Sequence, residues 1–325
     1  MARKNHFELT NEAVKQMDQQ LQTLRLLIEF YSTGPGKDLL LKITPAKKVF
    51  IIAEGGGFEL AEWTARQCNL SGLDARAVSQ GDFAKWPRTL INQADKLVFL
   101  PLEPTDSAML SIYSPVELVL IDGHPQEDSA HEPVFLPLLT PLIDWNNSLL
   151  VCGVLCWLLC RQMTGSNDGS EADKLKNLRQ RLQLLVEGHP VLLEKWKKCL
   201  YGMDRLAVVA SGSQFLAARA TVDILAAQVG QQCALFNSLS ALHDSAEWIG
   251  PGWGVICFSD SADEEAISRP IFEELDFRGA ACIRLVEGFP QFFSEKQRPP
   301  SALEMDLSVF LNTFSGFLLT ISIEL

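Results

Sequence analysis

Three consecutive glycines, Gly55, Gly56 and Gly57, directly follow the apolar stretch Val49 to Ala53. That stretch has the length and the β-branched content of a buried strand. After the glycines, apolar residues recur at helical spacing as far as Cys68. Backbone N–H groups at the start of a helix bind anions, so this turn is a candidate site for a charged ligand.

A second stretch, later in the chain, repeats this layout. The sequence predicts a strand at Leu206 to Ala210, a polar turn at Ser211 to Ser213, and a helix from Gln214 onward. A strand that leads through a tight turn into a helix is the first part of an α/β unit. Two such units predict two similar α/β domains.

The elements that must position these turns alternate between strand and helix. Such alternation predicts mostly parallel sheets covered by helices on both faces, with ligands beyond the carboxyl ends of the strands. We therefore expect an α/β protein of two similar three-layer α/β/α domains related by an approximate two-fold axis. The expected parts are a helical segment 1–46, a first domain 47–163, a helical linker 164–203 and a second domain 204–325.

Periodicity and turn residues predict the elements one by one. The first helix is expected to be capped by Thr10 and to end near Phe30, and the linker helix to be interrupted at Pro190. Strands are expected at 49–53, 75–79, 96–100, 117–121, 134–136, 206–210, 233–236, 253–258 and 280–286. Further helices are expected near 58–69, 86–93, 142–161, 241–247, 263–275 and 303–318.

Composition limits the classes of partner. The chain has 325 residues, 47% of them hydrophobic and 21% charged, which is typical of a globular protein. A net charge of −12 argues against nucleic acid or an anionic membrane as a partner. The sequence starts without an apolar leader, and its longest apolar run, Leu149 to Cys160, is too short for a membrane span. We therefore expect a cytoplasmic protein.

Two groups of residues have the types of metal ligands. Cys152, Cys156 and Cys160 share one helix face, but their neighbours are Leu, Val and Trp, among which cysteine packs as a small apolar residue. A polar loop holds a second group, for which a solvated loop is the favoured interpretation: Asp122, His124, Glu127, Asp128 and His131. We therefore expect no metal, no cofactor and no disulfide.

The two units and the helices between them resemble the tandem sugar-isomerase (SIS) domains of phosphosugar isomerases and deglycases, including the isomerase half of glucosamine-6-phosphate synthase. The resemblance covers nearly the whole chain. It rests on IIAEGGGFELA, VSQGDF, the helix that ends the first domain, and ASGSQFLAARATVDILA followed by ALFNSLSALHDSA. It implies a sugar-phosphate or amino-sugar ligand, isomerase or deglycase chemistry, and a homodimer.

In this family a G-[ST]-S turn and an S-x-S-G-x-T loop hold the sugar phosphate in the first domain. Here the turn is Gly55 to Gly57, without hydroxyls, and the loop matches residues 101–106, with Glu103 and Thr105. Each lost hydroxyl contact to a charged group is worth about 1.5–3 kcal/mol, and the Glu103 carboxylate would add repulsion. Two interpretations stay open: a changed ligand such as a neutral or amino sugar, or a loop that binds nothing.

The second domain matches the family's phosphate-binding residues better than the first. Ser211 and Ser213 resemble the turn, and Ser259 and Ser261 resemble the serine loop. The alternative, which we favour, is that Ser261 or Asp263 caps the following helix.

The resemblance also implies where catalysis would occur. Synthase-like enzymes move the sugar proton with a glutamate on a second-domain helix and open the ring with a histidine. Ala220 stands at the matching glutamate position and Asp223 lies one turn further on, whereas His243 matches the histidine. Asp223 and His243 are therefore the candidate catalytic residues. Three functions stay open: a divergent isomerase or deglycase, a non-catalytic carbohydrate-derivative-binding or regulatory protein, and a structural dimerisation module.

Overall fold

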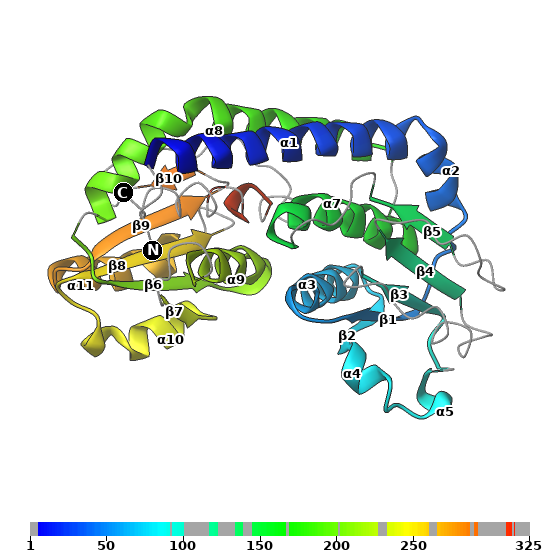
Figure 1. Cartoon of the computed structure of the whole chain (residues 1–325). Coiled ribbons are helices and arrows are strands. Elements are labelled where there is room, and N and C mark those ends of the chain that lie inside the picture. Colours follow the sequence, from blue (N-terminus) through cyan, green and yellow to red (C-terminus); the bar gives the residue numbers. More distant parts are fainter. Residues whose placement is uncertain are drawn as a thin grey trace. The chain divides into compact units, whose positions relative to one another are not determined.

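The chain forms two compact units, each with a five-stranded sheet (Figure 1). The first unit is Gln20–Asn177, and the second unit combines the residues from Leu178 onward with the beginning of the chain up to Gln19. The computed structural model describes residues 6–91, 93–100, 117–122, 134–138, 145–166, 169–200, 202–226, 233–259, 265–286, 289–291, 310–313 and 315.

The sheet of the first unit is entirely parallel, in the order β2-β1-β3-β4-β5. Its strands are β1 (Lys48–Ala53), β2 (Asp74–Ser79), β3 (Lys96–Phe99), β4 (Glu117–Asp122) and β5 (Val134–Pro137). Its helices are α2 (Pro35–Leu41), α3 (Gly56–Leu70), α4 (Gln80–Phe83), α5 (Arg88–Ile91) and α7 (Trp145–Thr164). The five expected strands are all present, and α2 is a helix that the sequence did not predict.

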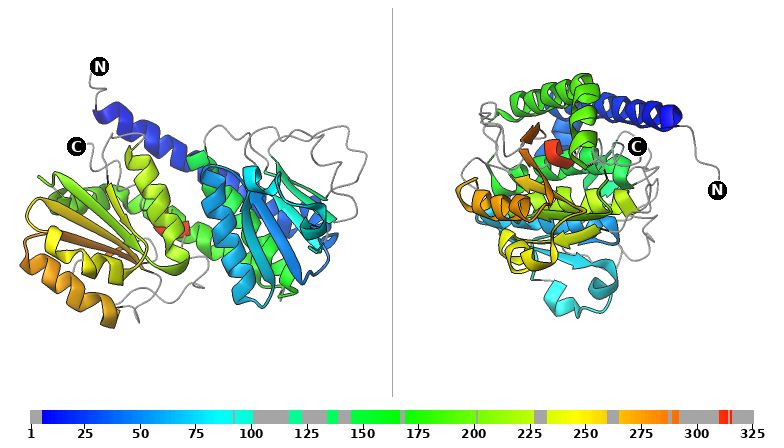
Figure 2. Two further views of the ribbon diagram at one scale, coloured as in Figure 1. Left: turned by 90° about the horizontal axis from the view of Figure 1, so that it is seen from below. Right: turned by 90° about the vertical axis from the view of Figure 1, so that its left-hand side faces the viewer.

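Helices cover both faces of this first sheet (Figure 2). Alternate strand residues such as Phe50 and Phe99 form a buried cluster with Phe83 of α4 and Ile91 of α5. The helix α3 packs against β1 and β2, and also against α7. A parallel sheet that is buried on both faces needs nearly continuous apolar strands, and this explains why the strands were recognisable in the sequence.

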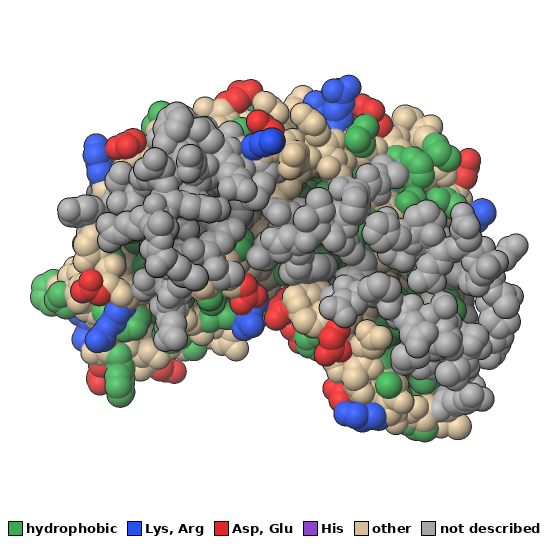
Figure 3. Space-filling model, in the orientation of Figure 1, with side chains coloured by type: hydrophobic (Ala, Val, Ile, Leu, Met, Phe, Trp, Pro, Cys, Tyr) green, Lys and Arg blue, Asp and Glu red, His purple; other side chains and the backbone are tan. Residues whose placement is uncertain are grey.

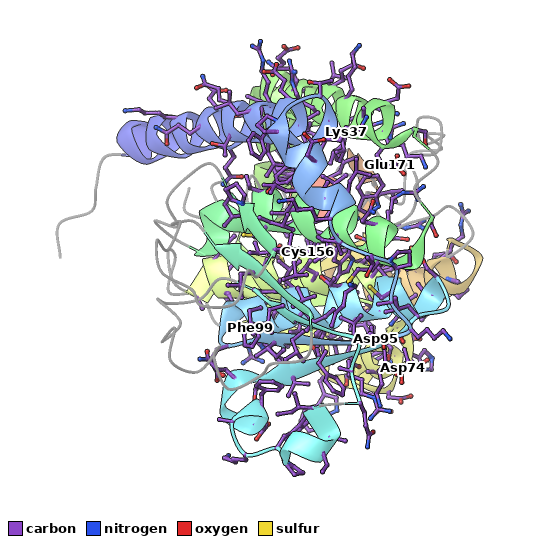
Figure 4. All side chains as sticks on the ribbon, turned by 90° about the vertical axis from the view of Figure 1, so that its right-hand side faces the viewer. Lys37, Asp74, Asp95, Phe99, Cys156 and Glu171 are labelled. Atoms are coloured by element: carbon purple, nitrogen blue, oxygen red, sulfur yellow. The ribbon has the colours of Figure 1, made fainter. Side chains whose placement is uncertain are left out.

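One exposed carboxylate supports the amino edge of the first sheet. Asp95, just before β3, accepts hydrogen bonds from the backbone N–H groups of Lys47 (2.7 Å) and Lys48 (3.0 Å), at the start of β1. Figure 4 shows Asp95 near Asp74 at this edge, with Phe99 toward the other end of the strands. These hydrogen bonds hold the pKa of Asp95 below its usual value.

The sheet of the second unit has the order β10-β9-β8-β6-β7, and only β10 is antiparallel. Its strands are β6 (Arg205–Ala210), β7 (Cys233–Phe236), β8 (Trp253–Ser259), β9 (Ala281–Val286) and the unexpected β10 (Phe289–Gln291). Helical elements are η2 (Gly212–Gln214), α9 (Phe215–Ile224), α10 (Leu239–Asp244), η4 (Ala246–Trp248), α11 (Glu265–Phe277) and residues 310–313 and 315. In each sheet, the first strand of the unit lies between the second and the third.

Two long helices, α1 (His6–Ser32) and α8 (Glu171–Leu200), contribute residues to both units. Thr10 lies inside α1 rather than at its cap, because the helix begins at His6. The expected interruption at Pro190 is wrong, since α8 continues through it. A proline inside a helix removes one hydrogen bond, and the burial of Leu185 and Trp196 on either side offsets that cost.

The expected fold class is therefore confirmed as two α/β units with essentially parallel sheets. Among the helices that the structure describes, none combines the length and the apolar character required to cross a bilayer.

Candidate functional site

The glycine turn lies at the carboxyl end of β1, where the sequence predicts it. Gly55 has φ +52° and ψ −135°, a conformation that glycine adopts without the strain of a side chain. The helix α3 begins at Gly56. The N–H groups of Gly57 and Phe58 donate to the carbonyls of Glu54 and Gly55, each at 3.0 Å. These two N–H groups, which we expected to face an anion, are therefore hydrogen-bonded within the turn.

Carboxylates surround this turn. The side chain of Glu54 accepts a hydrogen bond from the Gly81 N–H at 3.3 Å. The Ser79 hydroxyl accepts from the Asp82 N–H (3.1 Å) and donates to Asp82 Oδ2 (2.9 Å). Glu54 and Asp82 are exposed and follow two neighbouring strands. Acidic side chains gather over α3 and α4 in Figure 3. Lys85 offsets part of this charge, because its Nζ lies 3.6 Å from Oδ1 of Asp82. The carboxylate of Glu54 still disfavours a phosphate group at the turn.

Some of the residues that we expected at this edge lie outside the described residues. Glu103 and Thr105 lie outside the described residues, as do His124, Glu127, Asp128 and His131. Asp122 is the last residue of β4, so it shares the carboxyl edge of the sheet with Glu54. Glu54 was missed by the sequence reasoning, although its position directly before the glycine run was a usable signal.

Three of the expected serines lie at the carboxyl edge of the second sheet. Ser211 and Ser213 belong to the turn after β6, in which Gly212 has φ +61°. Ser259 is the last residue of β8, the neighbour of β6, and it is buried. Ser261 and Asp263 lie outside the described residues. The structure therefore brings Ser211, Ser213 and Ser259 to one edge.

A buried polar network joins this edge to a late part of the chain. Nδ2 of Asn312 lies 2.7 Å from Oε1 of Gln214 and 3.0 Å from the carbonyl oxygen of Ser259. Nη2 of Arg284, on β9, donates to the Ser259 hydroxyl at 3.0 Å. All four side chains are at most 2% exposed. Gln214, Arg284 and Asn312 were not predicted from the sequence. The charged Arg284 inside the apolar strand ACIRLV could have indicated a buried polar network.

The first candidate base, Asp223, is paired on its own helix. Its Oδ2 lies 3.2 Å from Nε of Arg219, and both side chains are 44% exposed. Asp223 is eight residues beyond Phe215 on α9, which places it about 12 Å along the helix from its start at the carboxyl edge. Ala220, at the position of the family's glutamate, is buried. The structure does not bring Asp223 to the serines.

The other candidate, His243, lies on α10 near the end of α11. Its Nε2 is 4.0 Å from Oε2 of Glu274, and its Nδ1 is 3.8 Å from Oδ1 of Asp244. Because α11 follows β8 and runs back along the sheet, its last turn, with Glu274, lies toward the amino edge. His243 is therefore separated from Ser211, Ser213 and Ser259.

The cysteines of α7 are packed as expected. Cys152, Cys156 and Cys160 are buried, and Sγ of Cys160 lies 3.2 Å from Sγ of Cys68 on α3. Cys156 is labelled in Figure 4. Burial raises its pKa to about 12, so its thiol stays protonated at neutral pH. Within the described ranges, no group of three or more His, Cys, Asp and Glu side chains is arranged to hold a metal ion.

Solved structures resemble the chain in fold. The C-terminal domain of glucosamine-fructose-6-phosphate aminotransferase from Francisella tularensis has a TM-score of 0.63 and 12% identity, covering 96% of this chain and 95% of that one. Glucosamine-6-phosphate deaminase from Thermotoga maritima has a TM-score of 0.66 and 16% identity, with 96% and 94% covered. Tagatose-6-phosphate ketose/aldose isomerase from Escherichia coli has a TM-score of 0.64 and 15% identity, with 95% and 91% covered.

No protein-family model matches the chain, and no curated protein matches its sequence. At identities this low, similarity between structures shows the fold alone. The resemblance to SIS proteins that the sequence indicated is thus confirmed at the level of the fold.

Proposed function

We propose that this chain is a non-catalytic binding protein for a carbohydrate derivative. The observation that carries the proposal is the lack of a usable base among the candidate residues described above. Buried Ala220 stands at the matching position, Asp223 is paired with Arg219, and His243 lies toward the opposite edge of its sheet. Isomerisation requires a base within hydrogen-bond reach of the proton that it removes.

The ligand class follows from the fold and from the charge at the first sheet. The three solved structures named above are enzymes whose names specify glucosamine, fructose or tagatose phosphates, which supports a sugar derivative. Glu54, together with the expected contribution of Glu103, disfavours a phosphate group and favours a neutral or amino sugar. A sugar phosphate is the competing ligand.

The proposed assembly is a cytoplasmic homodimer, with SIS-like domains at 47–163 and 204–325 that are related by an approximate two-fold axis. Leu184 and Val191 support the dimer, because they are 57% and 64% exposed and lie seven residues apart on one face of α8. Apolar residues on an exposed helix face are suited to pairing with a second copy. Light scattering at micromolar concentration tests this, and a monomer would contradict it.

Two measurements test the proposed function. A thermal-shift screen compares glucose, glucosamine and their 6-phosphates, since a ligand that binds only the folded state raises the melting temperature. We expect a shift with glucosamine or glucose that exceeds the shift with either phosphate. If no sugar derivative shifts the melting temperature, the structural dimerisation module becomes the better explanation.

The second measurement follows proton–deuterium exchange at the second carbon of fructose 6-phosphate and of glucosamine 6-phosphate. We expect no exchange above the rate without protein, because a positioned base contributes about a hundred- to ten-thousand-fold. Robust exchange that disappears in His243→Ala or Asp223→Asn would identify a divergent isomerase or deglycase instead.

A further inference from the structure

The strand order of the second sheet defines a switch point between β6 and β8. From β6 the chain passes through α9 to β7 on one side, and then through α10 to β8 on the other side of β6. In open α/β sheets, ligands bind outside the carboxyl ends of the strands at such a switch point. A ligand of the second unit would therefore lie between the ends of β6 and β8.

Residues from both sides of this switch point are bonded to Asn312. The turn after β6 provides Gln214, whose Oε1 accepts from Asn312 Nδ2 at 2.7 Å, and the end of β8 provides the Ser259 carbonyl, which accepts at 3.0 Å. The carboxamide of Asn312 is fully buried. One side chain from a distant part of the sequence thus bridges the two strand ends.

Both polar groups of Ser259, at the end of β8, are engaged by other protein groups. The hydroxyl of Ser259 accepts from Arg284 at 3.0 Å while its carbonyl accepts from Asn312. Phe310 and Leu311, in the same helical segment as Asn312, are at most 1% exposed. Apolar packing therefore holds this segment in place together with the hydrogen bonds.

We propose that residues 310–313 close the switch point of the second sheet, with Asn312 making the contacts that a ligand would otherwise make. If the second sheet is closed in this way, the carbohydrate derivative binds at the first sheet. This assignment deepens the proposed function and rests on it. At the carboxyl edge of that sheet, no described atom lies within 4 Å of a Cβ built at Gly55 or Gly81.

Amide hydrogen exchange of the full chain, followed by mass spectrometry, tests the closure. In the unaltered protein we expect slow exchange in peptides covering 206–216 and 253–259, since buried hydrogen-bonded amides exchange only on opening. Asn312→Asp removes the Nδ2 donor without changing the shape of the side chain, and should accelerate exchange in these peptides about tenfold. Asn177→Asp, on an exposed position of α8, is the matched control and should change neither peptide.

Equal exchange rates in Asn312→Asp and the unaltered protein would overturn the closure. If Asn312→Asp does not fold, Asn312→Ser shortens the side chain without adding a charge, and the same comparison applies to it.

A second arm adds glucosamine or glucose during exchange. We expect protection of residues 53–60 and 79–84, and no protection of residues 211–216. Protection of residues 211–216 in the unaltered protein would overturn the proposal, because a ligand would then enter the switch point. If neither probe protects any peptide while Asn312→Asp still accelerates exchange, the closure stands and the proposed binding function fails.

Discussion

At the carboxyl edge of the first sheet, Glu54 after β1 and Asp82 after β2 are exposed carboxylates, whereas at the same edge of the second sheet Gln214 after β6 and Ser259, the last residue of β8, are buried and both bonded to Asn312. The strand order around the first strand of each unit is the same. One topology therefore supports exposed carboxylates at one edge and a buried polar network at the other. The residues that follow the strands, rather than the order of the strands, decide whether an edge is available to a ligand.

The largest expected effect is on stability, at the carboxyl edge of the second sheet. Arg284→Ala removes a buried stem and the hydrogen bond to the Ser259 hydroxyl, so we expect a loss of about 3 kcal/mol or more in the free energy of unfolding. Urea unfolding followed by tryptophan fluorescence measures it. The control is Arg278→Ala, whose partially exposed pair with Glu274 should contribute about 0.5 kcal/mol. Similar losses in both variants would mean that the buried network does not stabilise the edge.

The next largest effect on stability is expected at the glycine turn, at the carboxyl edge of the first sheet. Gly55→Ala forces a side chain onto φ +52°, which should cost about 1–2 kcal/mol of stability. Gly81→Ala is the matched control, because Gly81 belongs to α4 and has open space around it. The urea midpoint should fall for Gly55→Ala only. An unchanged midpoint would indicate that the turn relaxes without strain.

A smaller effect is expected on ligand affinity. Glu54→Ser removes a carboxylate from the carboxyl edge of the first sheet, and the affinity for glucose 6-phosphate should rise about fivefold, which corresponds to about 1 kcal/mol for a screened charge. Titration calorimetry at low and high salt measures it, because salt should reduce the difference. Glu62→Ser, on an exposed position further along α3, should have no effect. Glu103→Ser tests the predicted repulsion in the same way, and unchanged affinity in both variants would argue against an acidic site.

The smallest effect lies at the amino edge of the first sheet, at the opposite end of the strands from the glycine turn. Asp95 has a lowered pKa in the folded protein. Its stabilising contribution is therefore present above the unfolded pKa of about 4 and is lost as the pH falls through the folded pKa. Because the carboxylate is exposed, water screens it and the effect is small. The difference in stability between the protein and Asp95→Asn should shrink as the pH is lowered from 6 to 3, and a constant difference would contradict this.

Much of the fold could be predicted from the sequence because the strands are continuous apolar runs. The stretches 49–53 and 206–210 are buried on both faces and leave no alternation that could be confused with a helix. The helix α2 was missed because Gly34, Pro35 and Gly36 are typical of a turn. The strand β10 was missed because it has three residues and contains Pro290.

The candidate sites were predictable only as far as they depend on neighbouring residues. Gly55 and Ser259 follow apolar runs, so their places at strand ends could be inferred. Asn312 bonds to residues 53 and 98 positions away in the chain, and no local pattern reports such a contact. His243 fits a motif by spacing, but its distance from the serine edge depends on where α10 packs.

The two units share the helix α1, and this has a consequence for synthesis on the ribosome. The first unit is one continuous segment and is complete once Asn177 has emerged, so it can fold while the rest of the chain is being made. The second unit combines the residues up to Gln19 with those from Leu178 onward. The beginning of α1 is therefore made before the first unit, whereas the other residues of its own unit, from Leu178 onward, are made only after the first unit is complete.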